Sequence, residues 1–116
     1  MNRPARLSWS SMAVIPLFVV LLASTTAPAQ SDPSDGSALF KTKCAMCHGP
    51  DGAGKTPIGQ KLNVRDLHSA DVQKQSDAEL SQTIAQGKNK MPAFGKKLSA
   101  EQIKLLVACI RELGKK

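Results

Sequence analysis

Aromatic residues are scarce in this chain of 116 residues. They make up 3% of it, and the chain has no tyrosine, one tryptophan and three phenylalanines. Trp9 and Phe18 fall within the first 29 residues, which leaves only Phe40 and Phe94 for the rest. A small domain with so few large side chains lacks a large core of its own, and such domains usually depend on disulfides, a metal or another staple. Few aromatics and the lack of a nucleic-acid-binding motif also argue against nucleic-acid binding.

Strand patterns and catalytic groupings are missing too. No stretch of useful length alternates apolar and polar residues, and no internal repeat is present. Alternation is the main sequence signal of a β-strand, so we expect an all-α fold. Paired carboxylates, or a nucleophile with a base, do not occur in any recognisable arrangement. The chain is therefore not predicted to be an enzyme.

The first 29 residues have the composition of a secretory signal peptide. Arg3 and Arg6 form a positive start, an apolar stretch follows over about residues 12–23, and Ala27-Pro28-Ala29 is a small-residue cleavage site. A retained membrane anchor is the alternative. It is disfavoured because the apolar stretch is shorter than the roughly 20 residues that span a bilayer, and Pro16 interrupts it.

Cleavage after Ala29 gives a simple domain organisation. Residues 1–29 are then a signal peptide, 30–34 a flexible lead-in, and 35–116 one domain that is exported to the periplasm without a membrane span. Without the two arginines of the signal peptide, 14 basic and 9 acidic residues remain, a net charge of +5. This balance favours acidic partners.

Cys44-Ala45-Met46-Cys47-His48 is the motif with the strongest chemical meaning. Cys-x-x-Cys-His is the attachment signature of a haem bound through two thioethers. The two cysteines lie three apart on one helical turn and can reach both vinyl groups of a porphyrin, while His48 is placed to bind the iron. We therefore expect one haem c, attached covalently through Cys44 and Cys47, with a buried porphyrin that completes the core.

Helix signals surround this motif. Asp35 is a suitable N-cap for a helix that runs into the haem motif. Residues 49–59 contain four glycines and two prolines, which predicts a loop, and irregular structure is expected to continue through residue 66. A short helix is predicted near residues 69–75.

Two capping boxes predict the last two helices. Ser76-Asp77-Ala78-Glu79 begins a helix that Gly87 would end. Ser99-Ala100-Glu101-Gln102 begins the C-terminal helix, which has apolar residues at helical spacing and Gly114 as its stop.

Met91 lies in the loop between these helices, beside Pro92, and is the candidate second axial ligand. The alternative is simple packing into a gap in the core. Ligation by histidine and methionine raises the reduction potential and leaves no open position for oxygen or peroxide, which favours electron transfer over catalysis. His68 lies in a polar stretch typical of a surface histidine, and a bis-histidine haem would require it to displace Met91.

These motifs resemble those of the class I c-type cytochromes, in particular the short monohaem carriers of bacteria and photosynthetic organisms. The resemblance covers essentially the whole of 35–116. It rests on Gly36-x-x-x-Phe40, on the run from Cys44 to Gly52, on the run from Gly87 to Phe94, and on the terminal helix over 106–113.

The resemblance implies a small cytochrome c fold of three to four helices wrapped around one covalently attached haem. It also implies that the first and last helices cross near Gly36 and Phe40, where glycine permits close backbone approach. By analogy with the family, the Pro57 carbonyl would accept a hydrogen bond from the axial histidine. The implied ligands of the iron are His48 and Met91.

Arg65 is the candidate partner of a haem propionate, because a guanidinium pairs with two carboxylate oxygens in a fixed fork. An exposed loop arginine is the alternative. The complete set of predicted cofactor-binding residues is Cys44, Cys47, His48, Met91, Pro57 and Arg65.

The predicted function is single-electron transfer between redox partner proteins of a respiratory or photosynthetic chain, by a monomer. Lysines 88, 90, 96 and 97 flank Met91 and would attract acidic docking surfaces, or would simply keep the protein in solution. A thiol-disulfide enzyme would require a βαβ context that is missing here. A haem enzyme or gas sensor would require an open sixth position on the iron.

Cys109 departs from the family, whose members often carry an aromatic at this point in the terminal helix. A buried, inert thiol is the simpler interpretation. A disulfide between two copies of the chain is the alternative, because a third cysteine is left over in an exported protein.

Overall fold

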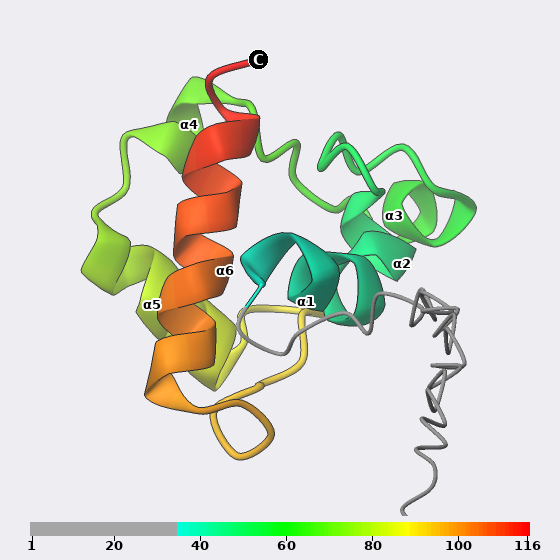
Figure 1. Ribbon diagram of the computed structural model, residues 1–116. Helices are drawn as coiled ribbons and strands as arrows, with labels where there is room; N and C mark the ends of the chain where they lie inside the picture. The colour runs from blue at the N-terminus through cyan, green and yellow to red at the C-terminus, as the bar shows by residue number, and fades with distance from the viewer. Residues whose placement is uncertain (1–34) are drawn as a thin grey trace, which may run out of the picture.

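The computed structural model describes residues 35–116, which are entirely helical in their regular structure (Figure 1). The expected signal peptide and lead-in lie outside the described residues. The helices are α1 (Gly36–Lys43), α2 (Ala45–His48), α3 (Pro57–Leu62), α4 (Ala70–Gln73), α5 (Asp77–Gln86) and α6 (Ala100–Leu113). In this part of the chain the only β pairing is one isolated bridge between Lys88 and Met91. The all-α prediction is confirmed.

Over residues 35–116, none of the helices has the length and hydrophobicity that a membrane crossing requires.

The predicted helix starts are confirmed by their caps. The Asp35 side chain caps α1. The Ser76 hydroxyl accepts a hydrogen bond from the Glu79 amide, and the Glu79 carboxylate accepts one from the Ser76 amide. Ser99 and Gln102 make the same reciprocal pair at α6. Each capping box pairs two amides that would otherwise lack a partner, which fixes where the helix begins.

The prediction of a continuous loop over 49–66 is wrong at α3. Thr56 adopts an extended conformation and its hydroxyl accepts a hydrogen bond from the Gly59 amide at 2.9 Å. Pro57 occupies the first turn, where its fixed φ suits a helix and its missing N–H costs nothing. Asn63, at a φ of 52°, ends the helix in the left-handed region. The local cap overcomes the loop-forming composition of this segment.

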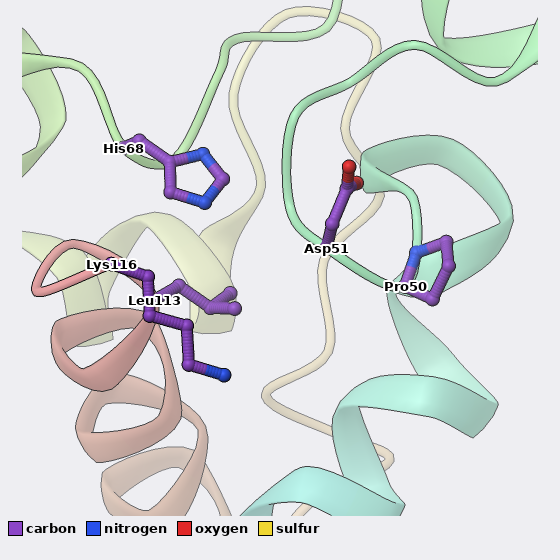
Figure 2. Close-up of a pocket in the computed structure, with 5 residues that line it drawn as sticks. All are labelled: Pro50, Asp51, His68, Leu113 and Lys116. Carbon is purple, nitrogen blue, oxygen red and sulfur yellow. The ribbon is translucent and has the colours of Figure 1, made fainter.

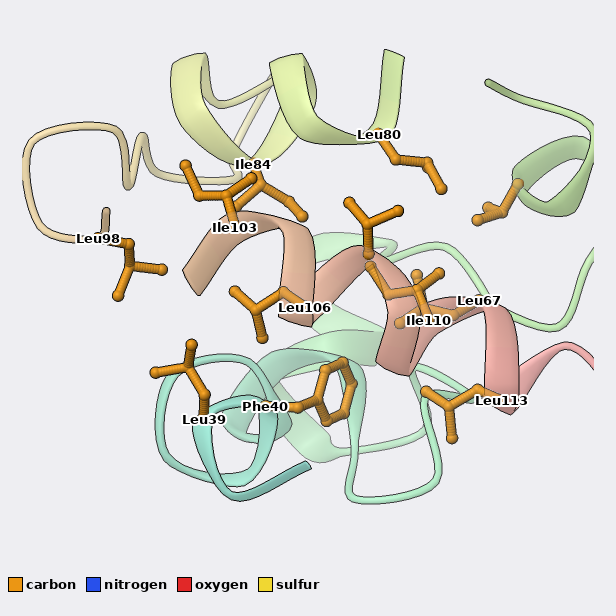
Figure 3. Close-up of a cluster of buried hydrophobic side chains, with 12 residues drawn as sticks. Leu39, Phe40, Leu67, Leu80, Ile84, Leu98, Ile103, Leu106, Ile110 and Leu113 are labelled. Carbon is orange, nitrogen blue, oxygen red and sulfur yellow. The ribbon is translucent and has the colours of Figure 1, made fainter. Parts of the chain in front are cut away.

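The core lies between helices that are distant in sequence. α6 is placed between α1 and α5, and Leu106, at 1% exposure, is its most deeply buried side chain (Figure 3). The buried apolar residues of α6 recur every three or four positions, so they form one apolar face that packs against both α1 and α5. The buried apolar residues are Leu39, Phe40, Leu67, Val72, Leu80, Ile84, Leu98, Ile103, Leu106, Val107, Ile110 and Leu113.

The crossing of α1 over α6 depends on Gly36. A Cβ atom built there would lie 2.3 Å from the carbonyl oxygen of Leu105, so no side chain fits. Phe40 follows one turn later and is 3% exposed, within the core between the two helices. The crossing implied by the family resemblance near Gly36 and Phe40 is confirmed. Cys109, one turn after Leu105, packs half-buried against the same core.

A polar clamp attaches the segment between α4 and α5 to α6. The Arg111 guanidinium donates to the carbonyls of Gln73 at 2.8 Å and Gln75 at 2.5 Å, and to the Asp77 carboxylate at 2.7 Å. The side-chain nitrogen Nε2 of Gln73 donates to the backbone carbonyls of Leu67 and Ile110. These bonds satisfy the carbonyls of Leu67, Gln73 and Gln75, which no backbone amide of the described residues pairs, and they hold the start of α5 in place.

Gly36→Ala tests the crossing. We expect it to destabilise the protein by about 1–3 kcal/mol, because a rigid backbone carbonyl faces the new methyl group. The measurement is guanidinium-induced unfolding of the haem-loaded protein. Ser37→Ala, at the next and exposed position of α1, is the control and should change stability little. Equal stability of the two variants would show that the helices can separate without cost.

Candidate haem-binding site

The three residues of the predicted haem motif that carry its chemistry are held on one short stretch of backbone. Cys44 follows α1 and is the N-cap of α2, and its carbonyl accepts hydrogen bonds from the amides of Cys47 at 3.2 Å and His48 at 2.9 Å. This single turn places both thiols and the imidazole beside the core. All three residues are half-buried.

A cavity of about 430 Å³ opens beside this turn. Cys44, Cys47 and His48 line it from α2, and Met91 lines it from the loop between α5 and α6. The structure thus brings together the four residues that the sequence assigned to haem attachment and ligation. Apolar side chains complete the wall, among them Phe40, Leu67, Val72, Leu80, Ile84, Phe94, Leu106 and Ile110.

Backbone hydrogen bonds hold the loop that carries Met91 in a tight turn. Met91 and Lys88 exchange two backbone hydrogen bonds, of 2.9 and 3.2 Å. Gly87 ends α5 at a φ of 75°, and a Cβ there would lie 2.5 Å from the Met91 carbonyl oxygen. Past the methionine, the Phe94 amide donates to the Ile84 carbonyl at 3.0 Å, which returns the loop to α5. Met91 is therefore presented to the cavity from a fixed turn.

The imidazole of His48 has an unusual environment. Burial lowers the pKa of His48, an effect that the nearby backbone carbonyl of Arg65 partly offsets. A lowered pKa favours the neutral imidazole, which is the form that binds a metal. Among residues 35–116, Nδ1 of His48 is the only buried side-chain nitrogen or oxygen without a hydrogen-bond partner.

The predicted hydrogen bond from His48 to the Pro57 carbonyl is not made in this structure. Pro57 does not line the cavity, and it forms the first turn of α3. The carbonyl of a residue in that position is directed along its own helix, where the amide four residues later is its natural partner. The carbonyl that acts on the imidazole is that of Arg65.

Arg65 itself is exposed and lines the cavity, within reach of a group bound there. His68 does not line this cavity. It lies in a separate hollow with Pro50, Asp51, Leu113 and Lys116 (Figure 2). There its Nδ1 is 2.6 Å from a carboxylate oxygen of Asp66. The structure therefore places His68 as a surface histidine, as its polar sequence context predicts.

Cys44 and Cys109 lie in environments that act on their thiols in the same direction. Burial raises the pKa of Cys44 to about 11, with smaller contributions from the charges that Cys109 and Cys47 would carry. Burial also raises the pKa of Cys109, the cysteine outside the motif. Both are therefore protonated thiols at neutral pH. The raised pKa of Cys109 agrees with an inert thiol that packs against the helix crossing.

These residues fit a covalently bound haem. Two thiols on one turn would supply the attachment points, and the His48 imidazole lines the same space as the Met91 thioether. Imidazole and thioether are both established axial ligands of haem iron. The largely apolar wall matches a porphyrin, and the four cationic side chains that line the cavity match its propionates. These cations are Lys43, Arg65, Lys88 and Lys90, and no carboxylate of the described residues lines the cavity.

Comparison with known proteins agrees with this geometry. Residues 31–110 match the family described as cytochrome c oxidase, cbb3-type, subunit III. The chain belongs to this family of small class I c-type cytochrome domains. Its cofactor is a covalently bound haem c with iron, and Cys44 and Cys47 are consistent with a Cys-x-x-Cys-His attachment site.

The chain is 38% identical over 91 residues to cytochrome c6 of Rippkaea orientalis, which covers 75% of this chain and 77% of that protein. It is 37% identical over 83 residues to the cbb3-type cytochrome c oxidase subunit FixP of Azorhizobium caulinodans, which covers 68% of this chain but only 26% of FixP. Among solved structures, the KustC0563 c-type cytochrome superposes with a TM-score of 0.64 at 36% identity, over 68% of this chain and 96% of that one. From its similarity to the cytochromes c6, this chain is a haem c electron-transfer protein and not an enzyme.

Some site residues were missed from the sequence. Lys43 contributes a cation to the cavity, and its position directly before Cys44 was the available signal. Val72 of α4 and Thr83 of α5 also line it. Leu80 and Ile84 lie four residues apart, on one face of α5, but that spacing alone does not show whether the face meets a haem site or another helix.

Replacement of both Cys44 and Cys47 by alanine should abolish covalent haem attachment. Because the two thiols are the predicted attachment pair, haem should separate from the polypeptide of the double variant on a denaturing gel stained for haem. Cys109→Ala is the matched control and should keep its haem through denaturation. A haem-stained band from the double variant would contradict the assignment of the thioethers.

Proposed function

We propose that the protein is an exported single-electron carrier whose haem iron is ligated by His48 and Met91. The observation that carries the proposal is one cavity lined on one side by Cys44, Cys47 and His48 and on another by Met91. The chain spans 77% of one cytochrome c6 and 93% of another, from a Synechococcus species, which supports a carrier of the same type.

When bound, the haem c supplies an iron that alternates between the ferric and ferrous states. His48 would hold the iron from the attachment turn, as a neutral imidazole favoured by its lowered pKa. Met91 would occupy the sixth position from the rigid loop after α5, so that electron transfer requires little rearrangement. Arg65 would pair with a haem propionate from the cavity rim.

The proposed location is the periplasm, to which the signal-like residues 1–29 would direct the chain. There it would act as a monomer. Cytochrome c6 relatives support the role of a carrier between redox partners. The proposed redox partners belong to a respiratory or a photosynthetic electron-transfer chain.

The distribution of charge supports docking of acidic partners at the haem cavity. Residues 41–65 carry five lysines and arginines against one aspartate, and residues 88–97 carry four lysines and no acid. None of the ten residues that form the five ion pairs of the described residues lines the cavity, whereas Lys43, Arg65, Lys88 and Lys90 line it and form no ion pair. Unpaired positive charge at the cavity would steer an acidic partner toward it.

Met91→Ala tests the axial ligand. We expect loss of the weak near-red absorption band of the oxidised protein, binding of carbon monoxide to the reduced protein, and a fall in reduction potential by a sizeable part of the roughly 0.8 V that axial ligands span. Met46→Ala is the matched control, because Met46 also lines the cavity but is 71% exposed. A near-red band that survives in Met91→Ala, or disappears in Met46→Ala, would exclude Met91 as the ligand.

Lys90→Glu tests the docking charge with a defined probe. Oxidation of the reduced protein by the anion hexacyanoferrate(III) should slow about threefold at low ionic strength, and the effect should fade as salt is added. Lys104→Glu is the control, since Lys104 pairs with Glu101 and lies two residues before Leu106, on the other side of α6 from the cavity. Stopped-flow absorbance gives both rates. Equal slowing in the two variants would mean that only net charge matters.

A further inference from the structure

The haem-binding turn α2 cannot pair its own carbonyls. An α-helix leaves its last four carbonyls without intrahelical partners, and α2 has only four residues. The Ala45 carbonyl accepts from the Gly49 amide at 2.9 Å, and the His48 carbonyl accepts from the Gly54 amide at 2.7 Å. The carbonyls of Met46 and Cys47 remain, and no backbone amide of the described residues reaches them.

A single hydroxyl fills this gap. The Thr56 oxygen lies 2.9 Å from the Met46 carbonyl oxygen and 3.1 Å from that of Cys47, so its one proton is shared between them. The same oxygen accepts the Gly59 amide at 2.9 Å. Gly59 fits tightly, because a Cβ there would lie 2.3 Å from the Cys47 carbonyl oxygen. Thr56 thus joins the end of α2 to the start of α3.

The orientation of the His48 ring depends on this backbone. A metal-binding histidine is normally oriented by a hydrogen bond from its second ring nitrogen. In the described structure Nδ1 of His48 has no hydrogen-bond partner of ordinary geometry, although the Arg65 carbonyl acts on the imidazole from nearby. The backbone on either side of His48 therefore helps to set where the ring points, and the Thr56 hydroxyl holds the two carbonyls directly before it.

We propose that Thr56 is a positioning residue for the axial histidine: its hydroxyl, by donating to the Met46 and Cys47 carbonyls, sets the orientation of the His48 imidazole on the iron. This rests on the proposed function, in which His48 is the axial ligand. The competing explanation is that Thr56 serves only as the N-cap of α3.

Three substitutions separate the two roles. Thr56→Ser keeps both donation and capping. Thr56→Asp keeps an acceptor for the Gly59 amide but has no proton to donate at neutral pH. Thr56→Val keeps the branched shape and loses both roles. Ser99→Ala removes the N-cap of α6 at the other end of the domain and serves as the control for loss of a cap alone.

The measurement is the electron paramagnetic resonance spectrum of the oxidised, haem-loaded full chain, because its g values depend on the orientation of the axial imidazole. Thermal unfolding is recorded in parallel. We expect altered or broadened g values in Thr56→Val and Thr56→Asp, the wild-type spectrum in Thr56→Ser, and a lowered Tm with an unchanged spectrum in Ser99→Ala.

A wild-type spectrum in Thr56→Asp overturns the proposal, whatever its Tm, because donation would then be dispensable. The same holds if Thr56→Val lowers only the Tm. If Val and Asp variants do not retain haem while the Ser variant does, the hydroxyl is required for the site and the proposal is supported. Failure of the proposed function is seen separately, as a wild-type protein without the near-red band of methionine ligation.

Discussion

The contact of α1 with α6 is the constraint on which the rest of this small domain depends. Gly36 allows the backbone of α1 to lie against the Leu105 carbonyl, and Phe40 then fills the space one turn further on. Because α1 leads directly into α2, the angle of this crossing also decides where the attachment cysteines lie. The haem cavity is therefore positioned by a contact that is itself outside the cavity.

Much of the fold could be predicted from the sequence because its signals are local. The capping boxes at Ser76 and Ser99 place two helix starts without reference to tertiary structure, and Gly87 and Gly114 place the corresponding ends. The helix α3 was missed because its residues include Gly59 and follow several other glycines. Its Thr56-Pro57 start was readable as an N-cap followed by a helix-compatible proline, but the tight contact of Gly59 with Cys47 that makes glycine necessary is tertiary.

The site likewise has a part that the sequence predicts and a part that it does not. Attachment and ligation follow from residue chemistry at fixed spacing, so Cys44, Cys47, His48 and Met91 could be chosen from the sequence, and the structure places them around one cavity. Hydrogen bonding around the ligand could not be predicted. The Pro57 bond rested on analogy, whereas the structure places the Arg65 carbonyl near His48 and uses Thr56 to pair the carbonyls of the turn. Such partners depend on how loops return to the helix, which local patterns do not encode.

The separation of paired from unpaired charge has a mechanical consequence. Ion pairs within 66–77 and 101–115 cancel locally, while the positive charges of 41–65 and 88–97 do not. A molecule with such a charge distribution has an electric dipole moment, and the field of an acidic protein exerts a torque on it before the surfaces touch. With the acidic partner proposed above, rotation during approach would bring Lys88 and Lys90, on the Met91 side, forward, so that a larger share of collisions would begin with the cavity already facing that partner.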